Sequence, residues 1–181
     1  MTRKEYPRCG VSVLEGKTSA GLPVFVFPMP GFQTKYALLA VKYGSCDRRF
    51  LPNGDYKEFP AGIAHYLEHK MFDMPDYNAA ERLSALGASP NAYTSPGMTG
   101  YMFSCTENFD SCLEELLRFV TTPCFTPESV ERERGIILQE MSMYEDDPAR
   151  RVDRRFFRAL YKEHPIRDPI TGTMESIASI T

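Results

Sequence analysis

The sequence has 181 residues, a length that suits one ordinary domain with a sizeable core. Hydrophobic residues make up 43% and charged residues 25%, which is a globular composition rather than a disordered or fibrous one. The 21 basic and 24 acidic residues are mixed along the chain, and a nucleic-acid-binding surface is excluded because it needs clustered Lys and Arg. The densest basic stretch, residues 149–158, is interpreted as a solvated helix face, with a groove for acidic partners as the alternative.

No apolar run has the length of a signal peptide or of a membrane span, so no membrane association is expected. The five cysteines are odd in number and show no CxxC spacing. Such cysteines are typical of reduced, mostly buried thiols in a reducing compartment. These features together predict a cytoplasmic protein.

The first quarter of the chain is predicted to form strands. Residues 22–30 ("LPVFVFPMP") and 35–45 ("KYALLAVKYGS") are β-rich apolar runs ended by proline or glycine. Residues 47–59 form a polar segment with an Asn-Gly turn signal, which indicates a loop.

The rest of the chain is predicted to alternate helices with one hairpin. Pro60 is placed where a helix can begin, Gly87 where one can end, and Thr126 where a helix can be N-capped. The segments on either side of Pro96-Gly97 read as the two strands of a hairpin. The predicted helices span residues 60–72, 78–88, 107–123, 126–148 and 148–165. Interleaved helices and hairpins predict an α+β fold, with a mostly antiparallel sheet packed by helices.

The segment "GIAHYLEHKMF", residues 62–72, holds two of the three histidines in the chain. His65 and His69 are four residues apart and lie one turn apart on the same face of a helix. Imidazole nitrogens suit zinc, and Glu68 is placed to take a proton from a zinc-bound water. The order His-x-x-Glu-His is the inverted zincin pattern. The alternative is an exposed helix with incidental histidines.

A catalytic zinc needs a third protein ligand and one open position. Glu133 and Glu140 lie two turns apart on one face of a predicted helix, and one of them could ligate while the other orients a histidine. The alternative is that both are solvated surface glutamates. His164 is the remaining histidine, but its place at a helix end is explained by the helix dipole.

Several motifs occur in the order that they have in one peptidase family. They are the segment 62–72, "LGASPNAYTS" at 86–95, "TGYMFSC" at 99–105 and "ERERGIILQEMSMYEDDP" at 131–148. Taken together they resemble the N-terminal domain of the pitrilysin/insulinase zinc peptidases, and most of all the bacterial YmfH-type branch. That branch is associated with elongation factor P modification.

This resemblance implies a zinc-dependent endopeptidase that hydrolyses peptides or small unfolded proteins, which would bind along an edge strand by backbone hydrogen bonds. It also implies a role for each matching residue. The zinc ligands would be His65, His69 and Glu140, with Glu68 as the base, Glu133 as a supporting residue, and Asn91 and Ala92 as substrate-binding residues.

The resemblance further implies that residues 1–181 form a single insulinase-like domain that is incomplete at its C-terminus. Family members close a chamber from two halves, so a second insulinase-like domain or subunit is expected as a partner. A non-catalytic subunit that acts through protein interaction is the alternative function. A metal-independent structural domain is the third possibility.

Overall fold

The computed structural model describes residues 1–51 and 53–181, without the side chain of Glu145. The chain divides into two compact units, Met1–Thr34 and Lys35–Thr181. All the predicted site residues belong to the second unit. The prediction of one domain over residues 1–181 stays a prediction.

The first unit is a three-stranded antiparallel sheet in the order β1-β2-β3. Only the third strand lies in a segment that the sequence predicts, and it ends at Val26 rather than near Pro30. The first strand is polar and exposed at every position, so it has no apolar alternation by which a strand could be recognised. The strands are β1 (Thr2–Tyr6), β2 (Val11–Lys17) and β3 (Pro23–Val26).

The second unit is built on a three-stranded antiparallel sheet in the order β4-β8-β7. Its strands are β4 (Lys35–Val41), β7 (Ser89–Thr94) and β8 (Thr99–Cys105). The predicted hairpin around Pro96-Gly97 is confirmed, because Ser95 donates its backbone N–H to the carbonyl of Met98 across the turn. Strand β7 therefore forms one edge of this sheet.

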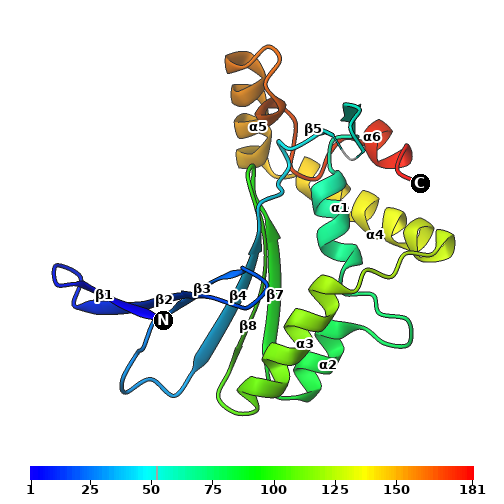
Figure 1. Cartoon of the computed structure of the whole chain (residues 1–181). Helices are drawn as coiled ribbons and strands as arrows, with labels where there is room; N and C mark the ends of the chain where they lie inside the picture. Colours follow the sequence, from blue (N-terminus) through cyan, green and yellow to red (C-terminus); the bar gives the residue numbers. More distant parts are fainter. Residues whose placement is uncertain (52) are drawn as a thin grey trace. The chain divides into compact units, whose positions relative to one another are not determined.

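Three helices cover one side of this sheet (Figure 1). They are α1 (Ile63–Lys70), α2 (Ala79–Ala85) and α3 (Phe109–Thr121). Their apolar faces meet alternate residues of β8 in a core that includes Phe103, Leu83 and Phe119. The helices and the antiparallel sheet confirm the predicted α+β class.

Helix α4 (Pro127–Glu145) packs against α1. Thr126 is its N-cap residue, as the sequence predicts, and it also exchanges a reciprocal pair of hydrogen bonds with Ser129. A second core, around Tyr66, Ile137 and Ile177, joins α1 and α4 to the short helix α6 (Met174–Ala178).

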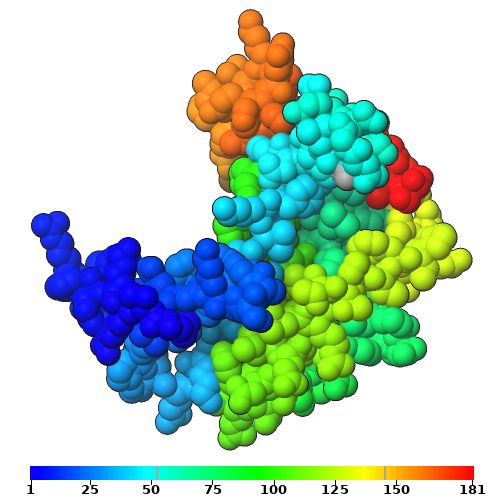
Figure 2. Space-filling view, in the orientation of Figure 1, coloured from blue at the N-terminus to red at the C-terminus, as the bar shows by residue number. Residues whose placement is uncertain are grey.

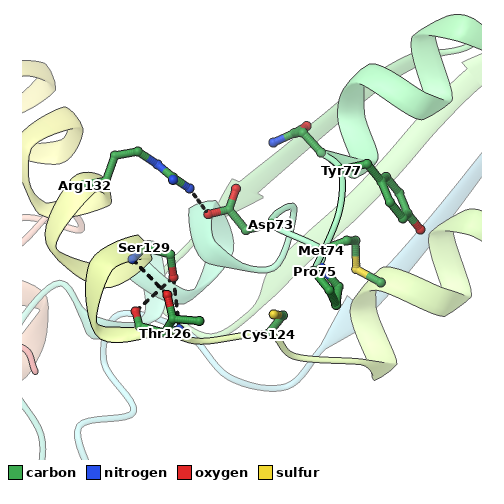
Figure 3. Close-up of a pocket in the computed structure, with 9 residues that line it drawn as sticks. Asp73, Met74, Pro75, Tyr77, Cys124, Thr126, Ser129 and Arg132 are labelled. Atoms are coloured by element: carbon green, nitrogen blue, oxygen red, sulfur yellow. Dashed lines mark hydrogen bonds and ion pairs between the residues drawn. The ribbon is translucent and has the colours of Figure 1, made fainter.

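Two polar contacts add to the packing of α1 against α4. The hydroxyl of Tyr66, on α1, donates to the backbone carbonyl of Val130, on α4. Beyond the end of α1, Asp73 accepts a hydrogen bond of 2.6 Å from Lys70. It also accepts one of 2.7 Å from Arg132 of α4, which Figure 3 shows. Because Lys70 is buried, its pairing with Asp73 satisfies a charge that would otherwise be costly.

Two predicted helix boundaries are wrong. Helix α1 begins at Ile63 rather than at Pro60, because Gly62 adopts a φ of +88° as its N-cap residue. Helix α5 (Pro148–Leu160) ends before residues 161–164, and Pro165 instead opens the short helix η1 (Pro165–Arg167). The predicted loop at 47–59 contains the short strands β5 (Arg49–Phe50) and β6 (Lys57–Glu58).

Helix α5 buries none of its residues, and Figure 2 shows its side chains, in orange, at the surface. The predicted solvated arginine face at 149–158 lies on this helix. Its apolar side chains Val152, Phe156 and Leu160 are exposed as well. Among the described residues, no helix is both long enough and apolar enough to cross a bilayer.

Candidate metal centre

Helix α1 brings His65 and His69 together. Their ring centroids are 4.6 Å apart, as the four-residue spacing predicts. His65 is buried, and His69 is partly buried with 24% of its side chain exposed. Both rings turn toward the facing surface of α4, so the two imidazoles share one site rather than solvent.

Helix α4 supplies a carboxylate to the same site. Oε2 of Glu140 lies 3.8 Å from Nε2 of His65 and 3.5 Å from Nε2 of His69. Two ligand atoms of a tetrahedral zinc ion are about 3.3 Å apart when each bond is about 2.0–2.1 Å long. The three side chains offer one ligand atom each, all within 4.8 Å of one another. This spacing fits a single small cation between the two helices.

The lack of a hydrogen-bond partner for one ligand atom also fits a cation at this site. Oε2 of Glu140 is buried and has no hydrogen-bond partner among the described residues. An unpaired buried carboxylate oxygen is costly, and so most such atoms are hydrogen-bonded or bind a cation. Because this oxygen faces two imidazole nitrogens, the donor set is one oxygen and two nitrogens, which suits zinc.

Glu133 contacts a histidine rather than the shared centre. Its Oε1 lies 2.9 Å from Nδ1 of His69. A neutral His69 that donates Nδ1–H to this carboxylate keeps its Nε2 lone pair directed at the site. Glu133 is buried, so its charge acts on the imidazole with little screening.

The two histidines differ in their electrostatics. Burial lowers the pKa of His65 to about 4, and the neighbouring His69 acts in the same direction. Burial also opposes protonation of His69, but the hydrogen bond and charge of Glu133 outweigh it and raise the pKa of His69. His65 is therefore neutral at pH 7 and ready to ligate, while a metal ion would compete with a proton at His69.

Glu68 lies next to the cluster and has a different partner. Its Oε2 accepts a hydrogen bond of 2.6 Å from the hydroxyl of Thr94, at the end of β7. Burial raises the pKa of Glu68, and the Thr94 hydrogen bond opposes that rise. A buried carboxylate with a raised pKa beside a metal cluster is typical of a general base.

The other predicted residues lie as follows. Asn91 and Ala92 are on β7, the edge strand, and the side-chain Oδ1 of Asn91 accepts from the Ala92 N–H. His164 does not join the cluster, since it is at the start of η1 and its Nδ1 accepts from the N–H of Ile166. The structure thus brings together His65, His69 and Glu140, with Glu68 and Glu133 beside them.

A surface pocket of about 360 Å³ lies elsewhere (Figure 3). It is lined by residues of the α1–α2 connection, of the α3–α4 connection and of the first turns of α4, including Asp73, Cys124 and Arg132. None of the predicted site residues lines it, and among its polar groups Arg132 already pairs with Asp73 and Ser129 with Thr126. We therefore place the candidate site at the histidines and not in this pocket.

Thr94 and Tyr144 contact the site, but the sequence analysis gave them no role. Thr94 follows Ala92 by two residues in β7, so strand alternation places both side chains on the face that meets α1. Tyr144 follows Glu140 by four residues in α4 and donates to its Oε1 at 2.5 Å. Strand and helix periodicity therefore predicts that both side chains face the site, but it does not predict which residues they contact.

The sequence also matches a family model described as Insulinase (Peptidase family M16), over residues 53–174. These residues include both site helices and the edge strand. The chain belongs to the insulinase family of peptidases. The predicted resemblance is thereby confirmed.

Individual members of the insulinase family agree with this assignment. The chain is 46% identical, over 179 residues, to a protein of Bacillus subtilis named as zinc protease YmfH. The aligned region covers 98% of this chain and 42% of that protein. It superimposes with a TM-score of 0.91 and 42% identity on the crystal structure of an M16-like peptidase from Alicyclobacillus acidocaldarius, covering 99% of this chain and 42% of that one. The chain thus spans less than half the length of these relatives.

A more distant member of the insulinase family shares the fold alone. The peptidase M16 inactive domain from Pseudomonas fluorescens superimposes with a TM-score of 0.76 at 19% identity, over 93% of this chain and 40% of that one. The insulinase fold therefore does not by itself establish catalysis, and the argument for an activity must come from the site.

Proposed function

We propose that this chain is the metal-bearing part of a zinc metalloendopeptidase that hydrolyses peptide bonds. The observation that supports it most is the buried Oε2 of Glu140, which lacks a hydrogen bond and faces Nε2 of both histidines. A zinc ion held by His65, His69 and Glu140 would supply Lewis acidity, which lowers the pKa of water and polarises a carbonyl group.

The residues around the ligands have complementary roles in this proposal. Glu68 accepts the proton of the attacking water, because it is a buried carboxylate next to the ligands with one oxygen held by Thr94. Glu133 keeps His69 in the tautomer that ligates through Nε2. In this arrangement each carboxylate has a separate task.

The substrate in this proposal is an extended peptide or a small unfolded protein. Hydrogen-bonded and non-hydrogen-bonded pairs alternate along an antiparallel ladder. Since Ser95 is bonded to Met98 across the turn, the backbone groups of Thr94 and Ala92 face the free edge of β7. A peptide added along this edge would pair with the backbone of Ala92, beside the side chain of Asn91, and run toward Thr94 and the Glu68 carboxylate.

Turnover in this proposal needs more than these 181 residues. The chain covers 42% of two relatives that resemble it over nearly its whole length. We infer that a second insulinase-like domain or subunit completes the substrate site, and that this chain alone binds zinc but hydrolyses peptides poorly.

A non-catalytic subunit is the second candidate function. The observation in its favour is the inactive M16 domain with a similar fold. Against it stands the retention of two histidines, a third ligand and a base in one cluster. A subunit selected only for interaction has no need of this set.

The test compares zinc content and peptidase activity of this chain and of its Glu68→Gln variant, each with and without a candidate second domain or subunit. We expect one bound zinc in both proteins and activity only in the first. Zinc without activity in the unsubstituted protein, with every partner tried, would favour the non-catalytic subunit. Activity that survives Glu68→Gln would contradict the assignment of the base.

A further inference from the structure

The third ligand has a hydrogen-bond partner that the proposed function does not use. The hydroxyl of Tyr144 lies 2.5 Å from Oε1 of Glu140, and both residues are on α4, four positions apart. This bond occupies Oε1. The oxygen that faces the histidines is the other one, Oε2. Glu140 is therefore held with a single oxygen available to the site.

Tyr144 is itself fixed from the next helix. The guanidinium carbon of Arg150, in the first turn of α5, lies 3.7 Å from the centroid of the Tyr144 ring, which is a close cation–π contact. Arg150 is held in turn by Asp147, the N-cap of α5, whose carboxylate accepts from the Arg150 N–H and lies 3.5 Å from its Nε. The contacts form a chain from Asp147 through Arg150 and Tyr144 to Glu140.

The direction of the hydrogen bond follows from the chemistry of the two groups. A phenol keeps its proton at neutral pH, while an ionised carboxylate can only accept. The Tyr144 hydroxyl therefore donates to Oε1 of Glu140. A charge-assisted O–H···O⁻ bond of this length is among the stronger hydrogen bonds in proteins.

We propose that Tyr144, held by Arg150, is a positioning residue that presents Glu140 to the metal ion through Oε2 alone. This inference rests on the proposed zinc site. A carboxylate that ligates through one oxygen leaves the fourth position of a tetrahedral ion open for water. Without the hydroxyl, the carboxylate is free to rotate, to bind through both oxygens or to turn away.

A purely structural role for Tyr144, as a tie at the end of α4, makes a different prediction. It would change the stability of the chain and leave the metal site as it is. The chain offers a matched control, because the hydroxyl of Tyr77 donates at 2.8 Å to the buried carboxylate of Glu115, which is outside the metal cluster. Tyr77→Phe removes the same kind of bond without touching the site.

The experiment uses the 181-residue chain, stripped of metal, and its Tyr144→Phe, Arg150→Met and Tyr77→Phe variants. The Kd for Zn²⁺ is measured by competition with a chromophoric chelator, and the visible spectrum is recorded with Co²⁺ in place of zinc. We expect Tyr144→Phe to weaken zinc binding by about 10- to 100-fold and to change the Co²⁺ spectrum. Arg150→Met should weaken it by about two- to five-fold, since a partly exposed cation–π contact is modest.

Thermal melting of the metal-free proteins separates the two roles. Tyr77→Phe should lower the melting temperature with an unchanged Kd for zinc and an unchanged Co²⁺ spectrum. If Tyr144→Phe behaves in the same way as Tyr77→Phe, the inference is overturned. The proposed zinc site fails separately if the unsubstituted chain binds no zinc, or if Glu140→Ala binds it equally well, and the inference then fails with it.

Discussion

Glu133 and Glu140 lie on one face of α4, two turns apart, yet their oxygens have different partners. Oε1 of Glu133 pairs with Nδ1 of His69, while Oε2 of Glu140 faces Nε2 of both histidines. The seven-residue spacing lets one helix supply both a proposed ligand and the support for another ligand. The two glutamates are therefore not interchangeable, because each carboxylate has its own partner.

Replacing Glu133 by Ala should weaken zinc binding about 10- to 100-fold, because Nδ1 of His69 loses the acceptor that orients the ring. The Kd for Zn²⁺, measured by competition with a chelator, checks this. Glu131→Ala is the matched control, since Glu131 is exposed on the same helix and pairs only with Arg134 among the contacts described. An unchanged Kd in Glu133→Ala would show that His69 does not need this support.

The hydrogen bond from Thr94 to Glu68 predicts a shift in pH dependence. Activity that requires ionised Glu68 is lost as the pH falls through its pKa. The hydroxyl lowers that pKa against the effect of burial, so Thr94→Val raises it. The acid limb of the pH–rate profile, measured with the second domain or subunit that supports activity, should then move to higher pH, whereas Thr94→Ser should leave it in place. A limb that stays in place in Thr94→Val would refute the role of this bond.

Contacts between residues close together in the sequence could be predicted, while contacts between distant residues could not. The spacing of His65 and His69 within one helix indicates a shared face, and the structure places the rings together. The residues alone left Glu133 and Glu140 with interchangeable roles, because both lie on the same helix face. The pairing of Thr94 with Glu68 spans 26 positions and depends on how β7 packs beside α1, which periodicity does not specify.

At the scale of the element, the start of α1 depends on one glycine. Gly62 has a φ of +88°, and a Cβ built on it would lie 2.5 Å from the carbonyl oxygen of Thr171. Gly62→Ala should therefore lower the free energy of unfolding by more than about 2 kcal/mol, because backbone strain and a backbone clash add together. Chemical denaturation measures this, and a loss below about 0.5 kcal/mol would contradict it.

Gly135 provides the control of opposite sign. It is exposed within α4, has a helical backbone, and a Cβ added there would meet nothing within 4 Å. Gly135→Ala should raise the free energy of unfolding by about 0.4–1 kcal/mol, since alanine loses less conformational entropy in a helix.

The elements that were missed or misplaced from the sequence have two different physical causes. Pro60 has a suitable place for a first helical residue, but the positive φ of Gly62 delays the helix to Ile63. Strand β1 pairs along its whole length with β2 while every residue of it is exposed, so backbone pairing rather than burial defines it. By contrast, the β7–β8 hairpin and α4 were recognisable from turn and cap residues that act locally.

At the scale of the whole molecule, every proposed ligand and its hydrogen-bond partner lies in the unit Lys35–Thr181. That unit places α1 and α4 against each other through the core around Tyr66 and Ile137. A cation bound between these helices would link them in addition to this apolar core. Metal binding should consequently stabilise this unit against unfolding.

Zinc at about 100 times its Kd should add about 2.7 kcal/mol to the free energy of unfolding, because the unfolded chain does not hold the three ligands together. For a unit of this size, that corresponds to a rise of about 5–10 °C in melting temperature. Differential scanning calorimetry with and without zinc measures it. The double variant His65→Ala, His69→Ala should show no rise, and an equal rise in that variant would point to a zinc site elsewhere.

The central claim is that one metal ion binds where α1 faces α4, ligated by His65, His69 and Glu140. The most direct measurement is an anomalous difference map, recorded at the zinc absorption edge from crystals of the zinc-loaded chain. The account predicts one peak about 2.0–2.2 Å from Nε2 of each histidine and from Oε2 of Glu140. A peak bound by other residues, or none within reach of these three atoms, would contradict it.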